Sequence, residues 1–211
     1  EARAAGAQEP PQVALPRPRM RIRLRSNRGV GEDLLCALSL QPELFRVWAD
    51  DPSLSVVDIS EMHAGDTTLR AFAAQLLRSG NCQLQRFICA NNPDISARGL
   101  LLVAEALQMN TTLVHLDLAS DAIGADGAEC IGELLELNAG LRTVLLRDNA
   151  MGDDGAAAIA FGLGRNNTLT ELDLASNGMT EVGVIAVLAA LHELEDLSFE
   201  EKQQATDQEL Q

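Results

Sequence analysis

The sequence repeats itself over three consecutive stretches: LVHLDLASDAIGADGAECIGELLELNAG (113–140), LRTVLLRDNAMGDDGAAAIAFGLGRNNT (141–168) and LTELDLASNGMTEVGVIAVLAALHE (169–193). Leucine, polar, glycine and helical positions recur at the interval that separates Leu113, Leu141 and Leu169. Two looser units precede them, at 54–83 and 84–112, and LEDLSF at 194–199 matches the start of a sixth. Such a period is typical of a repeat protein, whose units bury their apolar faces against one another.

Each unit predicts a strand followed by a helix. The LxxLxL segment places alternate residues on one side of a strand, so Leu172 and Leu174 are expected in the core with Leu169 at the entry. Glycines then open or enter a helix, as at Gly124 and Gly152. The apolar residues of the three helices recur at helical spacing. They are Ala128, Ile131 and Leu135; Ala156, Ile159 and Leu163; and Val184, Val187 and Leu191.

The ninth position of each unit is polar. It is occupied by Asn92, Asp121, Asn149 and Asn177 in successive units. An amide at this position can hydrogen-bond backbone groups where the chain leaves the strand. Stacking of the units therefore predicts a ladder of such residues through the molecule.

The pattern NxxGxxGAxxIxxxL at Asn149–Leu163 resembles the ribonuclease-inhibitor-like leucine-rich-repeat family. The resemblance covers roughly residues 54–199. It implies a right-handed α/β solenoid with a concave parallel sheet and convex helices. Relatives in the family include ribonuclease inhibitors, GTPase activators, innate-immune receptors and actin-capping tropomodulins, most of which bind proteins. The chain is similar to tropomodulin in length alone.

The segments outside the repeats are predicted to play separate roles. An amphipathic helix at 31–53, with its apolar residues including Phe45 and Trp48, is expected to cap the first repeat. Residues 200–211 are expected to form a polar C-terminal tail that covers the last repeat poorly. Residues 1–30 form a Pro- and Arg-rich arm, for which an extended chain is predicted.

The arm contains a strictly alternating stretch, RMRIRLR at 19–25. Its period of two fits a strand that adds to the open edge of the sheet at the first repeat, and a basic tail without regular structure is the alternative. The arginines predicted to bind a partner are Arg17, Arg19, Arg21, Arg23 and Arg25.

Charge is unevenly divided. Residues 1–30 hold seven Arg against two Glu, whereas the rest of the chain holds nine basic and 29 acidic residues. An acidic body disfavours nucleic acid as a partner, because phosphate groups would be repelled. The longest apolar run is too short to span a bilayer. We therefore expect a protein partner, with the basic arm lying on the acidic body or on an acidic partner within a larger assembly.

Neither a metal site nor a cofactor is expected. The four cysteines form no CxxC pair and the three histidines lie far apart. Buried free thiols indicate the cytoplasm or another reducing compartment. The Ala- and Arg-rich start is also compatible with the remnant of an organellar transit region, or with a trimmed chain.

The predicted partner-binding face is the sheet, where residues between the core leucines point outward. Those residues are Arg86, Ile88, His115, Asp117, Thr143, Leu145, Arg147, Glu171 and Asp173, with Val56 and Asp58 on the first strand. Acids, a few arginines and one exposed leucine suit a protein surface that carries basic patches. Simple solvation of these positions is the alternative for any one of them.

No catalytic residues are predicted. His115 beside Asp117 resembles an acid–base pair, but no nucleophile follows at a suitable spacing, and no phosphate loop of the GxxxxGK[ST] type occurs. Asp117 and Asp173 are two repeats apart, roughly 10 Å. The predicted function is a non-catalytic scaffold that acts as an adaptor or regulator. A constitutive subunit of a large assembly is one alternative, and a GTPase-activating or actin-capping module, by family analogy, is another.

Overall fold

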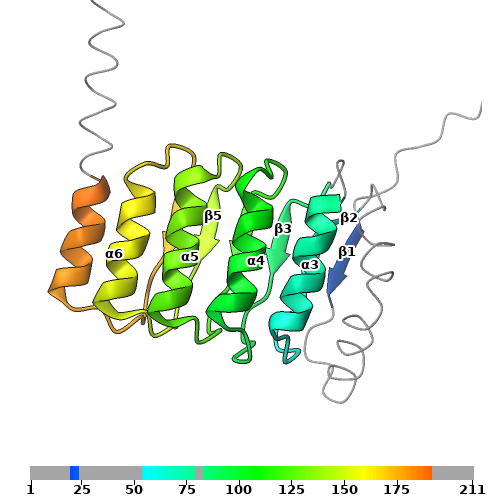
Figure 1. The fold of residues 1–211 in the computed structure, drawn as a ribbon, viewed down its shortest axis with the longest axis horizontal. Helices are drawn as coiled ribbons and strands as arrows, with labels where there is room; N and C mark the ends of the chain where they lie inside the picture. Colours follow the sequence, from blue (N-terminus) through cyan, green and yellow to red (C-terminus); the bar gives the residue numbers. More distant parts are fainter. Residues whose placement is uncertain (1–19, 24–53, 79–82, 192–211) are drawn as a thin grey trace, which may run out of the picture.

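The computed structural model describes residues 20–23, 54–78 and 83–191. Its elements form one layer of parallel strands and one layer of helices that covers a single face of the sheet (Figure 1). The strands are β1 (Met20–Arg23), β2 (Leu54–Asp58), β3 (Arg86–Ile88), β4 (His115–Asp117), β5 (Thr143–Leu145) and β6 (Glu171–Asp173). The helices are α3 (Asp66–Arg78), α4 (Ala97–Gln108), α5 (Gly124–Leu137), α6 (Gly152–Leu163) and a last helix at 181–191.

The strands pair in chain order, β1 to β6, and every neighbouring pair is parallel. Leu116, Val144 and Leu172 are partners on adjacent strands, as the repeat alignment predicts. Leu116 and Val144 are fully buried, and Leu172 is half-buried on the last described strand. The α/β solenoid is therefore confirmed for the five predicted repeat strands.

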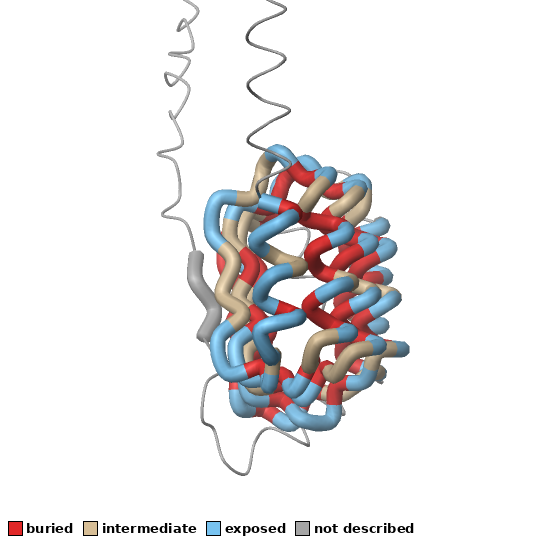
Figure 2. Tube along the Cα trace, turned by 90° about the vertical axis from the view of Figure 1, so that its left-hand side faces the viewer, coloured by how far each residue is buried: buried red, intermediate tan, exposed pale blue. Residues whose placement is uncertain are grey.

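The core lies between the two layers (Figure 2). Leucines of the strands and the helix residues Ile131, Leu135 and Ile159 fill it, with Phe72 and Phe87 stacked at the N-terminal end. Small residues on the helices let neighbouring backbones approach closely. A Cβ added to Gly132 would overlap the carbonyl oxygen of Ala158 on the next helix.

The predicted ladder of ninth-position residues is present and buried. Asn149 accepts a hydrogen bond from the backbone N–H of Asp121 (2.9 Å), and its amide nitrogen donates to the carbonyls of Leu118 (2.7 Å) and Leu146 (3.0 Å). Asn92 and Asn177 make the equivalent bonds. The side chains thus satisfy backbone groups that the turn after each strand leaves unpaired.

A second ladder follows the helices, at Asn110, Asn138 and Asn166. The amide nitrogen of Asn138 donates to the carbonyl of Leu107 (2.6 Å), and its oxygen accepts from the N–H groups of Gly140 and Leu141. Asn166 repeats the arrangement one unit later. The period of the repeat reveals this ladder in the sequence, but our sequence analysis missed it.

Two predictions about the ends of the solenoid are wrong. Val56 and Asp58 were expected to be exposed on the first strand, but both are buried, and their strand partners are Arg21 and Arg23 of β1. Val184 and Leu191 were expected in the core, but each is 43% exposed. No described helix packs on the outer side of residues 181–191, so the apolar side chains on that side of the helix have no neighbouring repeat to cover them.

Part of the flanking predictions falls outside the described residues. This applies to the capping helix at 31–53, the sixth strand at 194–199, the tail at 200–211 and most of the arm. The four described residues of the arm form β1, which adds to the edge of the sheet as predicted. No described helix is long and apolar enough to cross a membrane.

Candidate protein-binding face

The outward side chains of the sheet form two aligned rows. In β3–β6 the middle residue of each strand points inward, and the residues on either side of it point outward. Register then brings equivalent residues of successive strands side by side. The first row is Arg86, His115, Thr143 and Glu171, and the second row is Ile88, Asp117, Leu145 and Asp173.

The first row is linked by hydrogen bonds across the strands. A guanidinium nitrogen of Arg86 donates to Nε2 of His115 (3.3 Å), and the Thr143 hydroxyl donates to a carboxylate oxygen of Glu171 (3.2 Å). The row therefore runs from a basic end on β3 to an acidic end on β6.

The surroundings of His115 favour the neutral form of its imidazole. Partial burial lowers the pKa of the imidazole, and the adjacent Arg86 charge acts in the same direction, against Asp117 and Glu171. Since the Arg86 guanidinium can only donate, Nε2 of His115 must accept, which places the ring proton on Nδ1. Neutral His115 serves here as an acceptor that orients Arg86.

The second row combines half-buried apolar side chains with carboxylates. Ile88 and Leu145 alternate with Asp117 and Asp173 across the strands. Asp117 accepts a hydrogen bond from the N–H of Ala119 (3.1 Å), and Asp173 accepts one from Ala175 (2.9 Å). Each carboxylate is thereby fixed at the point where its strand ends.

Arg147 lies beyond these rows, at the exit of β5, and is exposed. The neighbouring Asp148 accepts a hydrogen bond from the Ser120 hydroxyl (3.1 Å). Ser120, Asp148 and Ser176 all have positive φ, so the chain turns in the same way after three strands. The structure thus places eight of the nine predicted sheet residues in the two rows, and Arg147 follows just beyond them.

The described residues of the arm form β1, which lies at the opposite edge of the sheet from β6. Arg21 and Arg23 are the strand partners of Val56 and Asp58. Arg17, Arg19 and Arg25 lie outside the described residues.

The face does not assemble a nucleophile with a base among the described residues. Cys89 follows Ile88, but its side chain is buried in the core, and this burial, reinforced by Asp121, raises the pKa of the thiol well above its usual value. No group of three or more His, Cys, Asp or Glu side chains in this part of the chain is placed to hold a metal ion. The arrangement offers charge, hydrogen bonds and apolar contact, which are the means of recognition.

A family model described as "Leucine Rich repeat" matches residues 110–132, 138–160 and 165–188. The chain carries leucine-rich repeats. These matches fall on the three units whose spacing is most regular. No curated protein sequence matches the chain at a significant level.

Solved structures share the leucine-rich-repeat fold. A structure of leiomodin-1 actin-binding site 2 has a TM-score of 0.61 and 23% sequence identity, and the match covers 80% of this chain and 95% of that one. The tropomodulin C-terminal domain from structural genomics of Caenorhabditis elegans has a TM-score of 0.53 and 17% identity, covering 80% of this chain and 98% of that one. The likeness concerns the fold.

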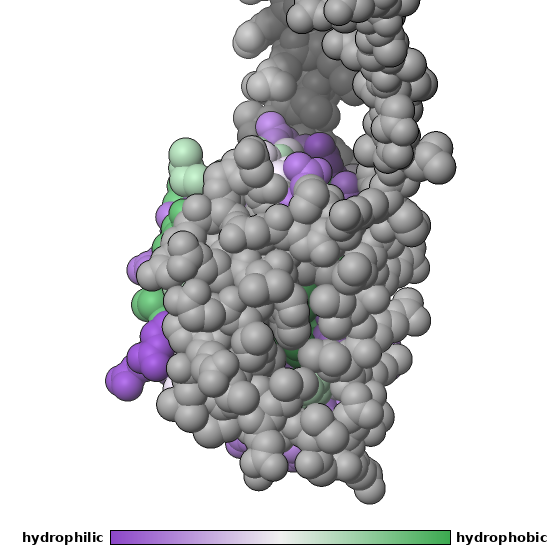
Figure 3. Space-filling model, turned by 90° about the vertical axis from the view of Figure 1, so that its right-hand side faces the viewer, coloured by the Kyte–Doolittle hydropathy of each residue, from purple (hydrophilic) through white to green (hydrophobic). Residues whose placement is uncertain are grey.

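Sequence reasoning did not single out residues of the helix face. The exposed Phe161 ring lies beneath the guanidinium of Arg165, 3.8 Å from the ring centroid. The repeat alignment could have revealed this pair. The equivalent positions of the preceding unit hold Glu133 and Leu137, so Phe161 is an apolar residue at a position where that unit is charged. In the view from the end that carries β1 and α3, the described side chains visible at the left edge include both hydrophilic and hydrophobic groups (Figure 3).

Proposed function

We propose that this protein is a non-catalytic scaffold that binds a partner protein through the sheet face and the basic arm. One observation carries the proposal: two rows of polar and apolar side chains lie in register on β3–β6 and point away from the core. A rigid solenoid presents such groups in a fixed pattern, which lowers the entropy cost of binding.

The pattern of the face defines the chemistry of the partner. An acidic group would meet Arg86, a basic group would meet Asp117 and Asp173, and an apolar side chain would pack on Leu145 between those two carboxylates. Half-buried Leu145 is the candidate centre of the contact, because apolar anchors at the centre of an interface contribute most of its free energy.

Reversing charges on this face tests the proposal. We expect Arg147→Glu combined with Asp173→Arg to abolish capture of the partner in affinity purification followed by quantitative mass spectrometry, with the chain still monomeric. The matched control is Arg98→Glu combined with Glu105→Arg, which changes exposed charges on α4 of the helix face. Equal capture by both variants would contradict a role for the sheet face.

A constitutive subunit of a large assembly is the alternative role for the same scaffold. In this role the basic arm, whose β1 pairs with β2 at the edge of the sheet, would hold the protein in its complex. Deletion of residues 1–30 is then expected to release the protein from its complex, and the chain expressed alone is expected to aggregate. An adaptor, in contrast, stays soluble and monomeric when it is expressed alone.

Actin is a specific partner to test, because the leiomodin-1 structure is described as an actin-binding site. The test is co-sedimentation of the full chain with actin filaments, together with a pyrene-actin elongation assay. We expect binding that the Arg147→Glu, Asp173→Arg variant loses. No co-sedimentation and unchanged elongation would exclude actin and leave the scaffold role to another protein partner.

A further inference from the structure

The outward face of the helices changes from charged to apolar along the solenoid. On α5 two outward positions hold Glu129 and Glu133, and in the next unit the same positions on α6 hold Ala157 and Phe161. In the last helix they hold Ile185 and Ala189. All six side chains are exposed. Because these positions face away from the core in every unit, the stacking of repeats does not explain the change.

The apolar part of this face contains a groove between α6 and the helix at 181–191. Its volume is about 500 Å³. Most of its lining residues are small, and Phe161, which is 55% exposed, is the large apolar residue among them. The lining residues are Ala157, Ala160, Phe161, Gly164, Arg165, Ala186, Ala189 and Ala190.

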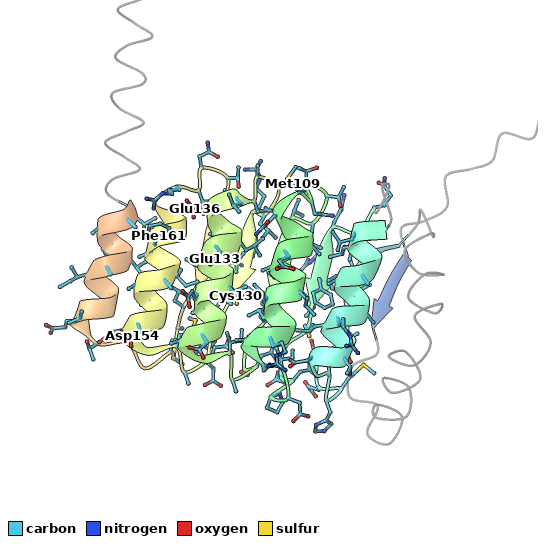
Figure 4. The ribbon with its side chains drawn as sticks, in the orientation of Figure 1. Met109, Cys130, Glu133, Glu136, Asp154 and Phe161 are labelled. Carbon is cyan, nitrogen blue, oxygen red and sulfur yellow. The ribbon has the colours of Figure 1, made fainter. Side chains whose placement is uncertain are left out.

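One charged residue, Arg165, lines the groove, and carboxylates of α5 lie one helix away from it. Arg165 lies over Phe161 and pairs with Glu136 of α5, with its Nε 3.5 Å from a carboxylate oxygen. Glu133, Glu136 and Phe161 lie along the same part of the helix face (Figure 4). Within the described part of the chain, Glu129 and Glu133 form no ion pair. One helix away from the groove, α5 thus offers carboxylates that have no basic partner there.

We propose that this groove, together with the carboxylates of α5, is a second docking surface that binds a basic amphipathic helix of another protein. The space between two neighbouring helices accepts the apolar stripe of a third helix. Arginine or lysine side chains on one flank of that helix would extend across the outer side of α6 and reach Glu129 and Glu133. The partner is therefore recognised by an apolar stripe beside a basic flank.

Charge favours a different protein over a second copy of the repeats as the occupant. Residues 54–191 contain 17 acidic and seven basic side chains, so two copies would bring like charges together. A basic helix is attracted to the same surface. This docking surface lies on the opposite layer from the sheet face and does not depend on the role proposed for that face.

The test selects helices against the full chain. A phage-displayed library of helical peptides of about 18 residues, long enough to follow the groove, is selected on the immobilised protein. Fluorescence anisotropy then measures the affinity of the enriched peptides. We expect these peptides to combine an apolar stripe with a flank of Lys or Arg.

Two pairs of substitutions separate the contributions of the groove and of the charges. Ala157→Glu with Ala189→Glu is expected to weaken binding at least about tenfold by filling the groove with charge. Glu129→Lys with Glu133→Lys is expected to weaken it about three- to tenfold at low salt, and less at high salt. The matched controls are Ala74→Glu and Glu105→Lys, on exposed positions of α3 and α4, with binding kept within about twofold.

Circular dichroism confirms that each variant is folded. The Arg147→Glu, Asp173→Arg variant of the sheet face should bind the selected peptides normally, which separates this proposal from the previous one. Failure to enrich peptides, enrichment of acidic flanks, or equal binding to the groove variants would overturn the proposal. A concentration-dependent dimer that Ala189→Glu dissociates in analytical ultracentrifugation would assign the groove to a second copy and overturn it as well.

Discussion

Asp121 stands in the buried ladder where neighbouring units carry Asn92 and Asn149. One of its carboxyl oxygens accepts from the N–H of Asn92 (2.7 Å), and the other has no hydrogen-bond partner. In the asparagines, the corresponding atom is an amide nitrogen that donates to two carbonyls. Burial, with the nearby Asp117, raises the pKa of the Asp121 carboxyl to about 8.

Replacing Asp121 by Asn should therefore stabilise the protein. At neutral pH the folded state keeps a proton that the unfolded chain has released, so the free energy of unfolding falls as pH rises from about 4 to about 8. We expect Asp121→Asn to raise this free energy by about 1–3 kcal/mol near pH 8, because the amide satisfies the orphaned position. Urea unfolding at several pH values measures both the gain and the loss of pH dependence.

The matched control for Asp121→Asn is Glu105→Gln, which removes an exposed carboxylate on α4. Its stability should change little with pH relative to the parent. A pH profile that is the same for the parent and Asp121→Asn would show that Asp121 is ionised normally in the fold.

His115 provides a second prediction at the level of one residue. Because its pKa is lowered in the folded state, the unfolded chain binds the proton more tightly, and stability is lost as pH falls below about 6.5. Arg86→Ala removes the second cause of the shift, so the pKa should rise towards its ordinary value without reaching it, since burial remains. An NMR titration of the imidazole measures this change, and an unaltered or lower pKa would contradict the assigned contact.

The distance between the backbones of α5 and α6 depends on glycine residues at the point where the two helices meet. A Cβ on Gly162 of α6 would overlap the carbonyl of Gly132 on α5, whereas a Cβ on Gly164 would meet its nearest atom, the Ala160 oxygen, at 3.5 Å. Gly162→Ala should thus force α5 and α6 apart and destabilise the protein by about 1–3 kcal/mol. Gly164→Ala should change stability by less than about 1 kcal/mol, and thermal unfolding compares the two. Equal effects of the two substitutions would refute the close contact.

At the level of elements, the sequence predicted what the period of the repeat determines. Strand positions, the core face of α5 and α6 and the buried Asn149 all follow from the constant interval between equivalent positions. The exposure of Val184 does not follow, because the same pattern is buried within a stack and exposed on its last helix. The burial of Val56 does not follow either, because the interval between repeats says nothing about the contacts that residues before the first unit make with it.

The candidate site was predictable in composition but not in its contacts. Alternation along each strand placed Thr143 and Leu145 on the outer face of the sheet. The hydrogen bond between Arg86 and His115 depends on the register between two strands and on side-chain rotamers, which a single chain does not reveal. The groove beside Phe161 depends likewise on how closely two helices pack.

On the scale of the molecule, the stacked units share one core and should unfold together. Leu116 is fully buried in β4, at the middle of the sheet. We expect Leu116→Ala to lower the free energy of unfolding by about 2–5 kcal/mol and to shift the whole transition. Amide hydrogen exchange compares protection in β2 and β6, and a loss of protection confined to β4 and its neighbours would show that the units unfold independently.

The asparagine ladder gives the solenoid a direction. The side-chain oxygen of Asn92 accepts from Met62 and Ala64 in the preceding unit, and that of Asn149 accepts from Asp121 and Ile123. Each turn is thus completed by the unit that follows it in the chain. Synthesis on the ribosome proceeds from the N-terminus, so the asparagine that completes the turn of a unit emerges only with the next unit. The folding of each unit during translation would therefore finish after the following unit has been made.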